Sequence, residues 1–237
     1  MPRPMIITID GTVGSGKTTA AAGLARRLAA QHLDTGAMYR ALTLKALQAG
    51  ANLEDPAALA ALTESTEIDL TGDPGALRVA MDGRDVTQAI RENRVSVNSH
   101  YLARTPEVRR VLVDKQRRFA ALAGNVVAEG RDQGTVVFPG ADVKFFLDAA
   151  LEVRARRRQL ELADRGEYKS YRDVLAEITE RDRRDSTRRA DPLRPAEDAV
   201  RVDTGDMTVE DMVDALAAEV RRRVPPGPAA AGGKETP

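Results

Sequence analysis

Residues 5–19 read M-I-I-T-I-D-G-T-V-G-S-G-K-T-T, and no other part of the chain constrains the architecture as tightly. The apolar, β-branched run Met5–Ile9 ends in an Asp-Gly turn signal, which predicts a buried strand. Gly11–Thr19 fits G-x-x-x-x-G-K-[ST], and Thr18–Ala30 has the apolar spacing of a helix. A strand, a glycine-rich loop and a helix in this order are the setting in which such a loop binds phosphate.

The chemistry of this loop follows from its residue types. Glycines let backbone N–H groups converge on phosphate oxygens, and the helix that follows adds the positive end of its dipole. Lys17 supplies a charge for the β- and γ-phosphates, and the Thr18 hydroxyl can ligate Mg²⁺. A plain glycine-rich turn with an exposed lysine is the alternative, but the glycines, the lysine and both flanking elements occur together. The residues expected to bind a nucleoside triphosphate are Gly11, Thr12, Val13, Gly14, Ser15, Gly16, Lys17, Thr18 and Thr19.

Three further apolar runs have the character of buried strands, and each stands near a helical segment: Val126–Ala128, Val143–Leu147 and Ala199–Val202. This alternation predicts βαβ units and an α/β fold with a parallel sheet covered on both faces. The segment Glu67–Val86 departs from it, because its apolar residues alternate around two turn signals. We expect a small antiparallel insertion there. Helical patterns over Met38–Ala49 and Glu107–Leu122 flank this insertion.

The composition excludes several classes of function. Lys plus Arg and Asp plus Glu number 36 each, so no overall charge draws the chain to nucleic acid or to an anionic membrane. The absence of cysteine excludes disulfides, thiolate metal sites and cysteine nucleophiles. The N-terminal apolar run is too short for a signal peptide and no stretch approaches a membrane span, which leads us to expect a cytoplasmic protein. Residues 225–237 lack large apolar side chains and are expected to form a disordered tail.

An unusual density of charge lies between Glu180 and Pro195, with six arginines and four acidic residues. In a helix, Arg181, Arg184, Asp185 and Arg188 would share one face. A solvated helix with weak ion pairs and a binding face for an anion both fit this pattern. The phosphate loop favours a small phosphotransferase. The acceptor of the phosphoryl group would then bind to residues elsewhere in the chain.

Four blocks of sequence together resemble the bacterial cytidylate kinases. They are L-D-T-G-A-M-Y-R, A-E-G-R-D-Q-G-T-V-V-F-P, V-K-F-F-L-D-A and E-R-D-R-R-D-S-T-R, in register from about Met5 to Val220. The resemblance implies a P-loop three-layer fold with a five-stranded parallel sheet, an enlarged monophosphate-binding insertion and a short lid. It implies one kinase domain over residues 1–224. In this division residues 4–34, 124–152 and 168–224 form the core, residues 35–123 the monophosphate-binding subdomain, and residues 153–167 the lid.

The resemblance also implies transfer of the γ-phosphoryl group of ATP, with Mg²⁺, to CMP or dCMP, which gives CDP or dCDP, by a monomer. The residues that match acceptor-binding positions are Thr35, Arg40, His100, Arg109, Arg131, Asp132, Arg181, Asp185 and Arg188; those that match catalytic positions are Lys17, Arg131, Arg157 and Arg158. Arg40 and Arg131 correspond to contacts with the acceptor phosphate. A kinase for UMP, AMP or a metabolite hydroxyl, and a nucleotide-binding module without catalysis, remain the alternatives.

The chain departs from the family pattern at a few positions. Thr12 and Thr18 stand where the family has proline and glycine, and Thr35 stands where it commonly has serine. His100 occupies the position of a serine that contacts cytosine, and Ser99 is one residue away. Either residue could therefore make the base contact.

Overall fold

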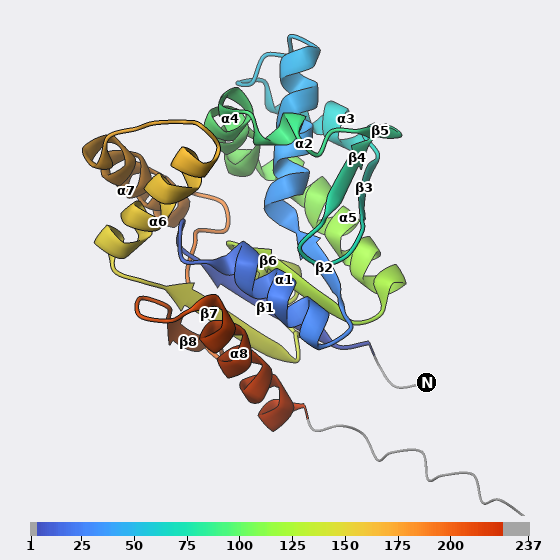
Figure 1. The fold of residues 1–237 in the computed structure, drawn as a ribbon. Coiled ribbons are helices and arrows are strands. Elements are labelled where there is room, and N and C mark those ends of the chain that lie inside the picture. The colour runs from blue at the N-terminus through green and yellow to red at the C-terminus, as the bar shows by residue number, and fades with distance from the viewer. Residues whose placement is uncertain (1–3, 225–237) are drawn as a thin grey trace, which may run out of the picture.

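A five-stranded parallel sheet forms the centre of the molecule in a computed structural model that describes residues 4–224 (Figure 1). The strand order is β2-β6-β1-β7-β8, and every neighbouring pair is parallel. The strands are β1 (Ile6–Gly11), β2 (Gln31–Asp34), β6 (Val126–Gly130), β7 (Val143–Asp148) and β8 (Val200–Asp203). The predicted α/β fold with a five-stranded parallel sheet is therefore confirmed, and the strand that leads into the phosphate loop is central.

Helices cover both faces of this sheet. On one face, α1 (Lys17–Arg27) and α8 (Val209–Arg223) pack against apolar residues of β1 and β7. On the other face, α2 (Thr35–Gln48) and α5 (Pro106–Ala123) pack on β2 and β6. Most of the strand residues between these layers are buried, and the majority of the buried ones are apolar, as in other parallel sheets.

The segment between α2 and α5 carries the predicted antiparallel insertion. Its sheet has the order β3-β4-β5, with antiparallel pairing throughout. The elements are α3 (Pro56–Glu64), β3 (Ile68–Thr71), β4 (Arg78–Met81), β5 (Arg84–Asp85), the short 3₁₀ turn η1 (Ala89–Arg91) and α4 (Asn93–Arg104). These elements share an apolar core with α2 and α5, so the insertion is packed firmly on one side of the parallel sheet.

Two helices after β7, α6 (Leu151–Asp164) and α7 (Tyr171–Thr187), pack on each other beside the carboxyl ends of the strands (Figure 1). Buried Ala155 and Leu162 of α6 meet Val174 and Ile178 of α7 in a small apolar cluster of their own. The pair is called the α6–α7 hairpin below. Residues 153–167, which the family resemblance assigns to the lid, include most of α6 and the turn that follows it.

The structure corrects two details of the sequence prediction. The first helix ends at Arg27 rather than at Ala30, because Ala29 has a left-handed backbone with φ of 49°. The strand β2 was not among the predicted apolar runs, since only four residues form it and three of them are polar. The expected tail, residues 225–237, lies outside the described residues. Within residues 4–224, no helix is long and apolar enough to cross a membrane.

Candidate active site

The carboxyl ends of β1, β6 and β7 meet at one edge of the sheet, and the loops that leave them form the candidate site. Open parallel sheets generally bind ligands outside these ends. Gly11 ends β1, and a side chain there would place its Cβ 2.0 Å from the carbonyl oxygen of Leu147. Gly16, the N-cap of α1, has φ of 85°, a left-handed conformation that favours glycine. The two glycines are therefore required by the path of the loop.

Lys17 is buried at the start of α1, and its ammonium group contacts the carbonyl of Thr12 and, at 3.5 Å, the hydroxyl of Ser15. Burial lowers the pKa of Lys17 well below its ordinary value, and repulsion by Arg131 lowers it further. A negatively charged ligand at this position would oppose both effects, because it stabilises the protonated amine.

Further contacts fix the phosphate loop to the rest of the molecule. The hydroxyl of Thr12 donates to Asp148 at the end of β7 over 2.7 Å. Arg154 of α6 donates to the carbonyl of Val13 at 3.1 Å and pairs with Asp182 of α7 at 2.5 Å. Asp182 in turn accepts a hydrogen bond from the Val13 N–H at 3.3 Å. The loop and the α6–α7 hairpin are thus joined by a buried arginine and its carboxylate.

Glu129, near the end of β6, is buried beside the phosphate loop. One of its carboxylate oxygens accepts a hydrogen bond from the Thr18 hydroxyl at 2.9 Å, and the other lies 3.1 Å from Nε2 of His32. Burial lowers the pKa of His32, but the hydrogen bond and charge of Glu129 outweigh it and raise the pKa above the ordinary value. Hydroxyl and carboxylate oxygens side by side are the donor types that suit Mg²⁺.

A group of arginines lies beyond the phosphate loop. Nε of Arg131 donates to Asp185 of α7 at 2.8 Å, and Arg40 pairs with Asp34 at 3.1 Å. The pKa of Arg181 falls to about 10, first through desolvation and then through repulsion by Arg131. The charge of Arg40 contributes to the same repulsion. Neighbouring guanidinium groups with few carboxylates between them are suited to bind an anion such as a phosphate.

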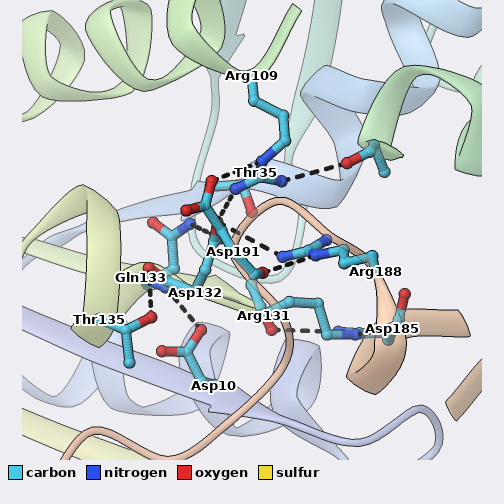
Figure 2. Close-up of polar contacts among 12 residues, drawn as sticks. Asp10, Thr35, Arg109, Arg131, Asp132, Gln133, Thr135, Asp185, Arg188 and Asp191 are labelled. Carbon is cyan, nitrogen blue, oxygen red and sulfur yellow. Dashed lines mark hydrogen bonds and ion pairs between the residues drawn. The ribbon is translucent and has the colours of Figure 1, made fainter. Parts of the chain in front are cut away.

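Asp132 lies next to this group, between two buried arginines (Figure 2). Nη2 of Arg109 donates to Asp132, and Nη2 of Arg188 is 3.6 Å from the same carboxylate oxygen. Other donors of Arg109 bind Asp191 at 2.8 Å and the hydroxyl of Tyr39 at 3.2 Å. Burial raises the pKa of Tyr39 to about 12, so this hydroxyl stays protonated.

A cavity of about 470 Å³ opens between the insertion and the end of α7. It is lined by Leu53, Glu54, Pro56, His100, Ala103, Arg104, Thr105, Pro106, Arg184, Asp185, Thr187, Arg188 and Arg189. Three residues that the sequence assigned to the acceptor, His100, Asp185 and Arg188, therefore line one cavity. Its volume falls within the usual range for small-molecule pockets.

Comparison with known proteins identifies the family. A family model for cytidylate kinase matches residues 7–222. A cytidylate kinase of Nocardia farcinica is 44% identical over 226 residues, which cover 95% of this chain and 97% of that relative. Another, from Pelotomaculum thermopropionicum, is 49% identical over 215 residues, which cover 90% and 95%. The chain belongs to the cytidylate kinase family.

The fold agrees with a more distant comparison. A crystal structure of an uncharacterized protein from Eubacterium ventriosum covers 93% of this chain and 100% of that chain, with a TM-score of 0.51 and 12% identity. At this identity the likeness shows a shared fold alone. The functional argument for this member of the cytidylate kinase family therefore depends on the close relatives and on the site.

Several residues matched to cytidylate kinase positions make contacts within the protein. Thr35 donates to the carbonyl of Glu129 at 2.6 Å. Nδ1 of His100 lies 2.7 Å from the carbonyl of Val97, and the Ser99 hydroxyl donates to the carbonyl of Ser96. Because a carbonyl can only accept, Nδ1 of His100 carries the proton in this contact. His100 lines the cavity and Ser99 is not among the lining residues.

The two arginines assigned to the lid lie in different surroundings. Arg157 donates to the hydroxyl and carbonyl of Thr204, at 3.1 and 2.6 Å, and to the carbonyl of Gly205 at 3.2 Å. Arg158 pairs with Glu161 one turn along α6, and its charge contributes to the lowered pKa of Arg181. Arg158 is thus the one that belongs electrostatically to the arginine group.

The helical pattern predicts only in part which arginines of the charged segment Glu180–Pro195 face solvent and which face the site. Arg183 and Arg184 both pair with Glu180 on the solvent side, at 2.8 and 3.0 Å. Arg188 is the C-cap of α7: its N–H donates to the carbonyl of Arg184 at 3.1 Å, but its own backbone is extended, so its side chain leaves the helical face. The predicted single face that includes Arg188 is therefore wrong, although its side chain is buried beside Asp132.

Sequence reasoning missed four residues that organise the site: Glu129, Arg154, Asp182 and Asp191. Glu129 lies in the A-E-G-R block, where its position at the carboxyl end of a strand beside β1 could have singled it out. The other three are in charge-rich segments and differ from their neighbours only in burial or in distant partners. The sequence carries no signal for such contacts.

Proposed function

We propose that this protein transfers the γ-phosphoryl group of ATP to CMP and dCMP, which yields ADP with CDP or dCDP. The observation that carries the proposal is that a phosphate loop, an arginine group and a cavity beside Asp132 converge at one edge of the sheet. The phosphate loop fits the donor, and the arginines fit the phosphate of the acceptor. The family and its relatives support a cytosine nucleotide as that acceptor.

In the proposed reaction, the loop Gly11–Thr19 holds ATP, and an oxygen of the acceptor phosphate attacks the γ-phosphorus in line. The acceptor phosphate is already anionic at neutral pH, so no protein base is needed. Catalysis then consists of positioning the two substrates and stabilising the charge on the transferring oxygens. We assign that work to Lys17, Arg131 and Arg158. The charge of Arg131 acts on Lys17, and the charges of Arg131 and Arg158 act on Arg181, which supports the assignment.

The proposed acceptor site is assembled from three parts of the chain. Arg40 and Arg131 would bind the phosphate, and Arg181 with Asp185 would bind the sugar. Asp132 and Arg188, with Arg109 behind them, would surround the base, and His100 lines the same cavity. All these residues come from one chain, so the proposed reaction needs no partner subunit.

Thr18 and Glu129 fit a magnesium site. Mg²⁺ is commonly held by one or two protein oxygens together with phosphate oxygens and water. Within residues 4–224 no group of three His, Asp or Glu side chains is arranged to hold a metal. When bound, the ion would neutralise charge on the phosphates of ATP. The protein's own part is the Thr18 to Glu129 hydrogen bond, which orients both oxygens.

Residues 153–167, the lid, are proposed to close over the substrates. Closure would exclude water, which otherwise competes as a phosphoryl acceptor. Arg157 holds the carbonyls of Thr204 and Gly205, so its proposed part in catalysis requires it to leave them when the lid moves.

A panel of acceptors tests the proposal. ADP release from Mg-ATP would be measured with CMP, dCMP, UMP, AMP or no acceptor. We expect fast release with CMP and dCMP, slower release with UMP and almost none without an acceptor. Equal release with and without CMP would contradict a kinase for this acceptor. A clear preference for AMP or UMP would assign another acceptor to the same site.

A further inference from the structure

Asp191 lies in the loop after α7 and contacts two of the arginines beside the cavity through different atoms (Figure 2). Its carboxylate accepts a hydrogen bond from Nε of Arg109 at 2.8 Å. Its main-chain carbonyl accepts one from Nε of Arg188 at 2.6 Å. The two arginines come from α5 and from the end of α7, which are more than seventy residues apart in the sequence. One residue thus fixes one guanidinium from each element.

The backbone around Asp191 is specialised for this contact. Asp191 has φ of 49°, a left-handed conformation that is unfavourable for most residues other than glycine, asparagine and aspartate. The N–H of Leu193 donates to the carbonyl of Asp185 at 2.8 Å, and Leu193 is buried. These contacts close the turn and hold it against α7. The turn therefore presents the carbonyl and the carboxylate of Asp191 in fixed directions.

The donors of Arg109 are largely occupied by the protein. Besides Asp191 and Asp132, they reach the hydroxyl of Tyr39 and the carbonyl of Ala103. Arg109 therefore has little capacity left for a ligand and acts as a support for Asp132. This differs from the direct contact with the acceptor that the family resemblance implies for Arg109.

Arg188 differs from Arg109, because Nη2 of Arg188 is buried and makes no hydrogen bond with any described residue. This nitrogen is 3.6 Å from Asp132, which is too long for a hydrogen bond. Burial lowers the pKa of Arg188, and the nearby positive charge of Arg109 adds to this effect. A buried, unpaired donor of this kind is costly unless a ligand or water accepts from it.

We propose that Asp191 is a positioning residue of the acceptor site. Its carboxylate holds Arg109 against Asp132, while its carbonyl holds Arg188 so that Nη2 of Arg188 faces the acceptor nucleotide. The identity of the acceptor rests on the proposed function, whereas the geometry of the turn does not.

Three substitutions separate the carboxylate from the backbone of the turn. Asp191→Gly tolerates the positive φ and keeps the carbonyl, but removes the carboxylate. Asp191→Asn also tolerates this φ and keeps an oxygen for Nε of Arg109. Asp191→Ala removes the carboxylate and disfavours the turn. The Gly and Asn variants therefore test the side chain in a turn whose backbone is kept.

We expect Asp191→Gly to raise the KM for CMP by about 10-fold to 100-fold, the range for a lost charge-assisted hydrogen bond. The kcat and the KM for ATP should change by less than about 3-fold, because the contact serves acceptor binding. Asp191→Asn should restore most of the affinity for CMP. Asp191→Ala should match the Gly variant in KM and also unfold at a lower temperature.

The control is Arg183→Ala, which removes an exposed arginine of the same segment. Calorimetric titration with CMP measures the same loss without turnover, so the result does not depend on the chemical step. A wild-type affinity for CMP in Asp191→Gly would overturn the proposal. So would an equal loss of affinity for ATP and CMP, or an Asn variant as impaired as the Gly variant. ADP release by the wild type in the acceptor panel tests the proposed function separately.

Discussion

The surroundings of Lys17 disfavour the positive charge of its side chain. The side chain is buried, and both burial and the charge of Arg131 lower its pKa. A triphosphate in the loop would reverse this balance by placing negative charge beside the amine. The residue is therefore suited to binding and poorly suited to stabilising the fold by itself.

Replacement of Lys17 by methionine separates these two roles. We expect Lys17→Met to lower CMP-dependent ADP release by at least about 100-fold, the usual cost of removing one stabilising group from a transferring anion. The melting temperature should stay close to that of the wild type, because an apolar side chain replaces a buried charge. Activity near the wild-type level in a folded Lys17→Met protein would remove this residue from the mechanism.

Two arginines five residues apart make a matched pair for the charged segment. The side chain of Arg188 is 8% exposed and lies beside Asp132, whereas that of Arg183 is 64% exposed and pairs only with Glu180. We expect Arg188→Ala to raise the KM for CMP about 10-fold or more. Arg183→Ala should change KM by less than about 2-fold, because surface ion pairs contribute little. Equal effects in steady-state assays would contradict this division.

At the scale of single residues, the sequence predicted the chemical role of a residue better than its contacts in the folded protein. The phosphate loop was identified from glycines and a lysine at fixed spacing, since local backbone geometry requires them. The link from Arg154 to Asp182 was not, because it joins two helices through contacts that only the folded chain creates. Arg157 has the residue type that suits a phosphate, but its donors lie on the carbonyls of Thr204 and Gly205.

Among the elements, α1 and α8 approach each other very closely. A Cβ at Gly23 would lie 2.4 Å from Cγ2 of Val213, closer than atoms of this kind approach. In an isolated helix, alanine would be favoured over glycine by about 1 kcal/mol. Here the contact between the two helices reverses that preference, so Gly23 is required by packing.

A double-mutant cycle measures this contact. We expect Gly23→Ala to lower the free energy of unfolding by about 1–3 kcal/mol, the usual cost of overpacking. Val213→Ala should also destabilise the protein, because it removes buried methyl groups. The double variant should be more stable than the sum of the two changes predicts, by about 1 kcal/mol or more. Strict additivity in urea denaturation would show that the helices adjust without strain.

The end of β1 is tied to the loop after β6 by Asp10. Its carboxylate accepts hydrogen bonds from the N–H groups of Gln133 and Gly134, at 2.9 and 2.8 Å (Figure 2). These residues begin η2 (Gln133–Val137), a turn of π-helix that directly follows Arg131 and Asp132. Burial raises the pKa of Asp10 to about 6, despite the two hydrogen bonds that lower it.

This raised pKa has a definite sign in the pH dependence of stability. Between the ordinary pKa of 3.8 and about 6, the folded state binds more protons at Asp10 than the unfolded state does. The contribution of Asp10 to the free energy of unfolding therefore falls as pH rises through this window. From pH 5 to 7.5, the wild type should lose about 1 kcal/mol relative to Asp10→Asn, which does not titrate. A constant difference between the two proteins in urea denaturation would contradict the raised pKa.

The elements themselves were largely predictable from apolar patterns. The runs behind β1, β6 and β7 are mainly apolar because both faces of these strands are covered, whereas β8 is a partly exposed edge strand that contains Arg201 between its two valines. The edge strand β2 escaped prediction because it has four residues, and His32 and Asp34 are there for contacts with Glu129 and Arg40. Arg188 was assigned to a helical face because the spacing of side chains does not show at which residue the helix ends.

For the whole molecule, the sheet acts as a fixed support between two separate packing units. The insertion shares its apolar core with α2 and α5, whereas the α6–α7 hairpin has a cluster of its own. The candidate site lies where these units meet the carboxyl ends of the strands. Arg131 in the loop after β6 pairs with Asp185 of α7, and Arg109 of α5 pairs with Asp191 in the loop after α7. These ion pairs join the three parts of the chain around the candidate site.

The uneven placement of charge has a consequence for how fast substrates arrive. Basic and acidic residues are equal in number, so the molecule as a whole exerts little net attraction on a nucleotide. At the site, however, the charge of Arg131 lowers the pKa of both Lys17 and Arg181 beyond the effect of burial, so positive charge around these two groups can attract anions during diffusion. We expect the association rate of CMP, measured by stopped-flow fluorescence, to fall several-fold as ionic strength rises from about 0.01 M to 0.15 M. A rate independent of salt would mean that encounter is random and that selection begins only after contact.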